Sequence, residues 1–112
     1  PKMEDGSFAT GVVGKDIDVN TAQDHAKRCG LAILSALRSE IGSLDKVEQV
    51  VKLNGFVCFH SEFYDQPKVI NGCSDLMLEI FGSKGVHARA AVGVISLPAN
   101  ISVEIEAIFK IK

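Results

Sequence analysis

The chain has 112 residues, of which 46% are hydrophobic and 23% charged, and its formal net charge at pH 7 is −2. A chain of this length predicts one domain, residues 1–112, large enough to bury a core of its own. Lys and Arg form no cluster of four or more, so no basic surface for nucleic acid is expected. No apolar run reaches the roughly 18–20 residues of a membrane span, and no membrane partner is expected.

Residues 1–18 contain three glycines around short apolar pieces, which predicts a loop with at most one short strand. From Asn20 onward, apolar residues recur at helical spacing and predict a helix that ends at Gly42. Either Asn20 or Thr21 is suited to the N-cap position. Gly30, near the middle, costs roughly 1 kcal/mol relative to Ala in a helix. A glycine there indicates close packing of this helix on a sheet.

The run Val47–Phe59 is rich in β-branched and aromatic residues and predicts a strand. Asn54-Gly55 interrupts this run, either as a hairpin turn or as a bulge, and we favour a bulge because the flanking pieces are short. A second helix follows, with Pro67 in its first turn and Gly82 as its C-cap. Its apolar stripe contains Val69, Ile70, Cys73, Leu76, Met77, Ile80 and Phe81.

Two apolar runs between Val86 and Ala107 are joined by Pro98-Ala99-Asn100 and predict an antiparallel hairpin. Ala90–Leu97 is nearly all apolar, which predicts a strand buried on both faces. The following strand alternates between two faces. Its apolar face holds Ile101, Val103, Ile105, Ala107, Phe109 and Ile111, and its polar face holds Ser102, Glu104, Glu106, Lys110 and Lys112.

The expected order is therefore short strand, helix, strand, helix, strand, strand. This order predicts an α+β two-layer sandwich, a mixed sheet with two helices packed on one face. The polar face of the sheet and the doubly apolar strand then have no cover from their own chain. Self-association is the commonest way in which a soluble chain supplies such a cover.

Cysteines and histidines give no sign of a metal site. Cys29, Cys58 and Cys73 are an odd number without CxxC spacing, and no histidines stand at metal-ligand spacing. No metal is therefore predicted, and free thiols favour a reducing, cytoplasmic location. His87 is interpreted as an ordinary loop histidine, with contact to a cleft as the alternative.

Four runs together resemble one known family. They are Gln66–Gly72 (QPKVING), His87–Val94 (HARAAVGV), Leu97-Pro98 and Val103–Ile108 (VEIEAI). The resemblance, from about Gly11 to the end, is to the RidA or reactive-intermediate/imine deaminase family, also called YjgF-like or L-PSP endoribonuclease-like. It implies a chorismate-mutase-like subunit in a homotrimer, with small-molecule sites in the clefts between subunits and no cofactor. The family normally has two further N-terminal strands, which we expect to be absent from this sequence.

The resemblance also implies an activity, the hydrolysis of 2-imino acids to 2-oxo acids and ammonia. Carried over by position, Arg89 would bind the substrate carboxylate, Ala91 would offer main-chain groups and Asn71 would assist binding. Glu104 would position or activate the water. Many members have Cys where Ala91 stands, so thiol chemistry at this position is ruled out here.

These residue types suit the chemistry on physical grounds as well. Arg presents a fork of donors that matches a carboxylate, and Glu can take a proton from water. A protonated imine is already electrophilic, so neither a metal nor a covalent nucleophile is needed. The plain alternatives are a surface salt bridge for Arg89 and a solvated strand residue for Glu104.

Two other function classes stay open. One is a non-catalytic module that binds a small 2-oxo or amino acid through Arg89. The other is the endoribonuclease of the family's older label, against which the acidic charge balance argues. The register of the predicted hairpin places Arg89 opposite Ile108 and Glu104 opposite Gly93. Because this separates the two residues, we expect a site that is completed by a neighbouring subunit.

Overall fold

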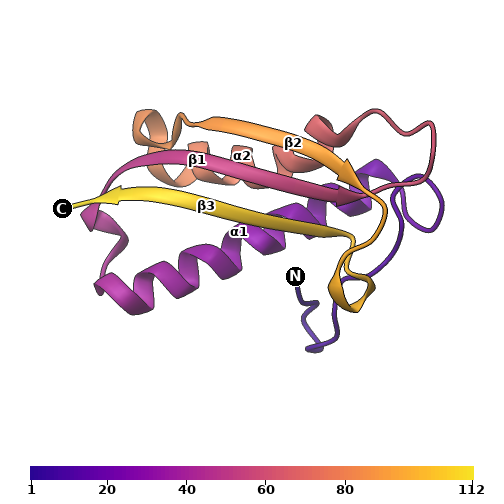
Figure 1. Ribbon diagram of the computed structural model, residues 1–112. Helices are drawn as coiled ribbons and strands as arrows, with labels where there is room; N and C mark the ends of the chain where they lie inside the picture. The colour runs from indigo at the N-terminus through magenta and orange to yellow at the C-terminus, as the bar shows by residue number, and fades with distance from the viewer.

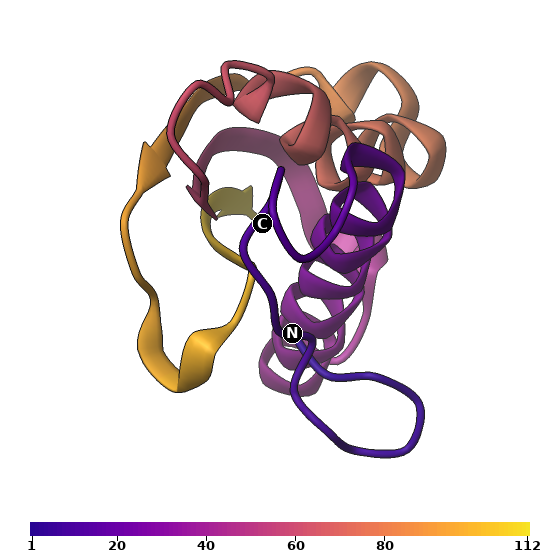
Figure 2. The same ribbon diagram turned by 90° about the vertical axis from the view of Figure 1, so that its right-hand side faces the viewer.

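The computed structural model describes all 112 residues, from Pro1 to Lys112. Two helices pack on one face of a three-stranded mixed sheet, and Figures 1 and 2 show both helices on the same side of it. This is the α+β sandwich expected from the sequence. The elements are α1 (Val19–Ile41), β1 (Val47–Cys58), α2 (Gln66–Phe81), β2 (Ala88–Val94) and β3 (Val103–Ile111), with the short 3-10 turns η1 (Leu44–Lys46), η2 (Gly82–Gly85) and η3 (Pro98–Asn100).

The strand order is β2-β1-β3, with β2 parallel and β3 antiparallel to the central β1 (Figure 1). The predicted hairpin is therefore wrong, because β2 and β3 lie on opposite edges of β1. The physical reason is the β1-α2-β2 unit, in which the helix returns the chain and makes the next strand parallel. With one edge of β1 taken by β2, the last strand pairs with the other edge. Residues 95–102 make the crossing, with positive φ angles of 56° and 57° at Ala99 and Asn100.

The strand β1 is continuous, as predicted, but its irregularities are elsewhere. The register shifts lie between Val47 and Gln49 and between Val50 and Lys52, whereas pairing runs unbroken through Asn54-Gly55. The bulge predicted there is wrong. Gly55 is explained by packing instead, since a Cβ at this position would lie 2.4 Å from the side chain of Ile70. The glycine lets α2 approach the centre of the sheet.

The N-cap of helix α1 lies two or three residues earlier than predicted. The carboxylate of Asp18 caps it by accepting the backbone N–H of Thr21 at 2.8 Å, so neither Asn20 nor Thr21 is the N-cap. The end at Gly42 is confirmed. Gly30 packs against the second helix and not against the sheet, because a Cβ there would meet Leu76 at 2.9 Å and Cys73 at 3.0 Å.

Helix α2 has the predicted limits, with Pro67 in its first turn and Gly82, at a φ of 58°, as its C-cap. No helix of the structure is both long and apolar enough to cross a membrane. The first 18 residues form no strand, only isolated bridges such as Thr10 with Ile101 and Val13 with Phe59. The short first strand of the expected order is therefore not formed.

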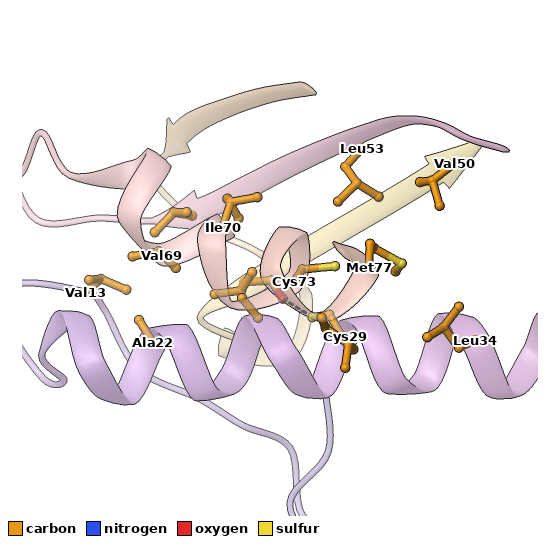
Figure 3. Close-up of a cluster of buried hydrophobic side chains, with 14 residues drawn as sticks. Val13, Ala22, Cys29, Leu34, Val50, Leu53, Val69, Ile70, Cys73 and Met77 are labelled. Atoms are coloured by element: carbon orange, nitrogen blue, oxygen red, sulfur yellow. Dashed lines mark hydrogen bonds between the residues drawn. The ribbon is translucent and has the colours of Figure 1, made fainter. Parts of the chain in front are cut away.

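The core lies between the sheet and the helices (Figure 3). Leu53 from β1 and Ile70 and Met77 from α2 belong to this core, and all three side chains are fully buried. All three cysteines are free and buried. Burial raises the pKa of the Cys73 thiol to about 12, so this cysteine is an apolar packing residue.

The opposite face of the sheet is open. Strand β3 alternates as predicted, with Val103 buried and Ile105 packed on the core while Glu104 is exposed. Strand β2 is not buried on both faces, because Val92 is 46% exposed and Ile95, just beyond the strand, is 88% exposed. Val92 thus leaves an apolar side chain exposed on the open face of the sheet.

Candidate functional site

A cleft of about 320 Å³ lies between α2 and the chain that leads into β2. One wall is a single face of α2, because its four residues are spaced three and four apart. The other wall is formed by the end of the connecting loop and the start of the strand. The lining residues are Asn71, Ser74, Asp75 and Leu78 on the helix, and Val86, His87 and Arg89 opposite them.

Arg89 crosses this cleft to the helix. Its Nη1 donates hydrogen bonds to Oδ1 of Asn71 at 2.7 Å and to Oγ of Ser74 at 3.1 Å. No carboxylate pairs with it, since the only salt bridges of the chain join Arg28 to Asp24 and Lys110 to Glu48. The N–H groups on Nε and Nη2 make no hydrogen bond within the chain, which leaves them available to a bound anion.

The direction of the Arg89 side chain follows from strand alternation. In the parallel register Arg89 lies beside Leu53 and Ala91 beside Gly55. Ala91 packs against the core, so Arg89, two residues earlier, points to the same helix-covered side. Because β2 is an edge strand, the guanidinium reaches the rim of the helix layer instead of its interior. The structure thus brings together two predicted binding residues, Arg89 and Asn71, with the main chain of Ala91 further along the strand.

Ser74 and His87 form hydrogen bonds in the cleft but were not predicted as site residues. Oγ of Ser74 lies 2.9 Å from Nε2 of His87, and Nδ1 of His87 also contacts the carbonyl oxygen of Gly85. The interpretation of His87 as an ordinary loop residue is therefore wrong. A signal for Ser74 was present in the sequence, because a serine three residues after Asn71 shares its helix face.

The loop that carries His87 is held firmly on both sides. The side-chain amide of Gln49, on β1, donates to the carbonyl oxygens of Lys84 and Val86. On the other side a Cβ at Gly85 would lie 2.4 Å from the carbonyl oxygen of Met77, so only glycine allows the loop to pack on α2. These contacts fix the position of this wall of the cleft.

Glu104 lies away from this cleft. It is exposed on the open face of β3, whereas Arg89 points to the helix side. Through β1, Arg89 is level with Leu53 and Glu104 with Phe56. Three residues along the strands and two strand spacings across them put the two Cα atoms roughly 14 Å apart. The pairings predicted from the hairpin, Arg89 with Ile108 and Glu104 with Gly93, are wrong.

Metal binding finds no support in the side-chain arrangement. No group of three or more His, Cys, Asp and Glu side chains is placed so that it could hold a metal ion. In the cleft itself, Asp75 is the one carboxylate among the lining residues, and it makes no salt bridge. The polar groups gathered here, a guanidinium, an amide, a hydroxyl and an imidazole, are suited to a small anion with further polar atoms.

The chain belongs to the YjgF-like family, because the model described as "YjgF/chorismate mutase-like, putative endoribonuclease" matches residues 1–109. Among individual proteins, it is 42% identical to Protein TCP17 of Trypanosoma cruzi over 112 residues, which is 99% of this chain and 70% of that protein. The resemblance seen in the sequence is thereby confirmed.

Solved structures agree on the fold. The protein Atu1372 from Agrobacterium tumefaciens, described as of unknown function, superposes with a TM-score of 0.94 at 50% identity, covering 97% of this chain and 71% of its own. A protein from Shewanella oneidensis, described as a putative endoribonuclease, gives a TM-score of 0.89 at 28% identity, covering 94% and 70% respectively.

Proposed function

We propose that the protein hydrolyses 2-imino acids to 2-oxo acids and ammonia, with the substrate carboxylate bound by Arg89. The observation that carries this proposal is the state of Arg89. Its guanidinium is anchored through Nη1 by two neutral oxygens, has no carboxylate partner, and keeps its remaining donors in a small cleft. A planar fork held in this way suits bidentate binding of a carboxylate.

The reaction needs little beyond positioning and proton transfer. Water adds to the carbon of the protonated imine, and a carboxylate takes a proton from that water. The nitrogen of the resulting carbinolamine then gains a proton and leaves as ammonia. The remaining hydroxyl group loses its proton as the carbonyl of the 2-oxo acid forms. Glu104 is the carboxylate that we assign to the proton transfer, and Asn71 and the main chain of Ala91 assist substrate binding.

Because Glu104 and Arg89 lie on opposite faces of one sheet, the site is composed of two chains. Glu104 of one subunit then serves a substrate held by Arg89 of its neighbour, in a homotrimer. The exposed Val92 and Ile108, at 46% and 57%, lie on the same open face as Glu104 and favour a protein cover there. Closure by a neighbour also excludes water and strengthens the contact between Arg89 and the carboxylate.

The test generates a 2-imino acid in solution, with an amino acid oxidase or dehydratase, and follows its disappearance by semicarbazide trapping. The protein should speed the loss of the imine and the release of ammonia. Arg89→Ala and Glu104→Gln should each remove the acceleration. A protein that binds 2-oxobutanoate in a calorimeter without any acceleration would be a binding module instead, and salt-sensitive RNA binding would favour the endoribonuclease.

A further inference from the structure

Ser74, His87 and Arg89 form a continuous chain of hydrogen bonds along one wall of the cleft. Nη1 of Arg89 contacts Oγ of Ser74, this oxygen contacts Nε2 of His87, and Nδ1 of His87 contacts the carbonyl oxygen of Gly85. Ser74 is 7% exposed and His87 half-buried. Ser74 is therefore the buried link of this chain of bonds, and His87 lines the cleft beside Arg89.

The direction of every bond in this chain is determined by its two ends. Arg89 can only donate, so Oγ of Ser74 accepts from it, and the carbonyl of Gly85 can only accept, so Nδ1 of His87 carries a proton. In neutral His87 the other nitrogen, Nε2, is then without a proton and accepts the hydroxyl hydrogen of Ser74. Each hydrogen has one partner, and the Ser74 hydroxyl has no freedom to rotate.

We propose that Ser74 and His87 are positioning residues that hold Arg89 in the orientation that binds the substrate carboxylate. His87, in the tautomer with the proton on Nδ1, directs the Ser74 hydroxyl, and the lone pairs of that hydroxyl hold Nη1. This deepens the assignment of the carboxylate site and rests on the function proposed above. Without the pair, Arg89 keeps Asn71 as its single anchor and the guanidinium samples other rotamers.

The loop that carries His87 is held by contacts from outside the cleft. Gln49 fixes Lys84 and Val86, and Gly85 packs against the backbone of Met77, so the carbonyl that accepts from His87 is held by residues outside the cleft. The chain of bonds is thus anchored at a rigid end. An Arg side chain immobilised in this way loses less conformational entropy when a ligand arrives.

The first experiment needs no ligand and is done on the whole protein by NMR. Long-range proton–nitrogen spectra should show the tautomer of His87 that carries its proton on Nδ1. The Nε–H signal of Arg89 should show a rigid side chain in the wild type and in His87→Gln, whose side-chain oxygen can replace Nε2 as acceptor. It should become mobile in Ser74→Ala and His87→Ala. A proton on Nε2 of His87, or an unchanged Arg89 signal in both alanine variants, overturns the proposal.

The second experiment measures 2-oxobutanoate binding and, where imine hydrolysis is found, its kinetics. Ser74→Ala and His87→Ala should each raise Kd and KM about tenfold, as expected for loss of one hydrogen bond to a charged group, with kcat nearly unchanged. His87→Gln should bind as the wild type does, and Ser83→Ala, a serine of the adjacent turn η2, is the matched control. Equal losses in His87→Gln and His87→Ala contradict the assigned acceptor role.

The two experiments separate this inference from the function on which it rests. If the wild type neither binds 2-oxobutanoate nor hydrolyses imines, the proposed function fails, and the NMR result still decides whether the pair holds Arg89. If the wild type binds and the alanine variants bind equally well, the function stands and the positioning role fails.

Discussion

Arg89 and Glu104 project from opposite faces of the sheet, on the two strands that flank β1. A single chain therefore cannot bring its own guanidinium and its own carboxylate to one small ligand. We expect Arg89→Ala and Glu104→Gln proteins to be inactive separately. After subunit exchange, an equal mixture should recover about a quarter of the wild-type sites by random assortment in a cyclic assembly. Mass spectrometry verifies the exchange, and no recovery after verified exchange would contradict a site shared between chains.

The open face of the sheet should be the surface that is covered in a homotrimer. Light scattering at micromolar concentration should give three times the mass of the chain. Val92→Asp should shift this toward the monomer, because a charge would be buried in the interface without a partner. Leu31→Asp is the control, since Leu31 is similarly exposed, at 49% against 46% for Val92, but lies on α1. Equal masses for the wild type and Val92→Asp would argue against this interface.

The shape of Arg89, and not only its charge, should decide binding. Arg89→Lys keeps the cation but loses the fork and one of the two contacts that Nη1 makes with Asn71 and Ser74. We expect 2-oxobutanoate to bind at least about tenfold more weakly, the loss of one charge-assisted bond, with an unchanged melting temperature. Calorimetry measures the affinity, and unaltered binding would remove Arg89 from the carboxylate site.

Gly72 should be indispensable to the contact between the two helices. A Cβ at this position would lie 2.0 Å from the carbonyl oxygen of Gln23 on α1. Ala in a helix is intrinsically better than Gly by about 1 kcal/mol, so any loss of stability measures the clash. We expect Gly72→Ala to lower the free energy of unfolding by about 2–3 kcal/mol, as overpacking does. Urea unfolding tests this against Glu79→Ala, an exposed position on the same helix.

Stability should decrease with acid because of His25. This side chain is 4% exposed and lies 2.6 Å from Oγ of Ser102. Burial holds the pKa of His25 below its ordinary value of 6.5, so the folded state favours the neutral ring. The stabilising contribution is complete above pH 6.5 and is lost as the pH falls from there toward the pKa of the folded state. Urea unfolding at several pH values should show a smaller decrease in His25→Gln over this window.

Local sequence determined the elements and the faces of this protein. Pro67 and Gly82 mark the ends of α2 because proline suits a first helical turn and glycine a left-handed cap, and both effects are local. The alternation along β3 predicted which residues face the helices, since strand geometry sends neighbouring side chains to opposite sides. Arg89 and Asn71 could also be chosen as candidate binding residues from the sequence. Each lies in a short continuous run of residues that resembles the family.

Only the tertiary structure decided which elements are neighbours. The apolar run of β2 indicates a strand but carries no information about its partner, and the return through α2 makes it pair with β1 instead of β3. This pairing places Arg89 on one edge strand of the sheet and Glu104 on the other. It also brings Ser74 and His87, 13 residues apart in the sequence, into one hydrogen-bonded chain with Arg89. Such contacts depend on packing between a helix and a strand edge, which no local pattern of residues encodes.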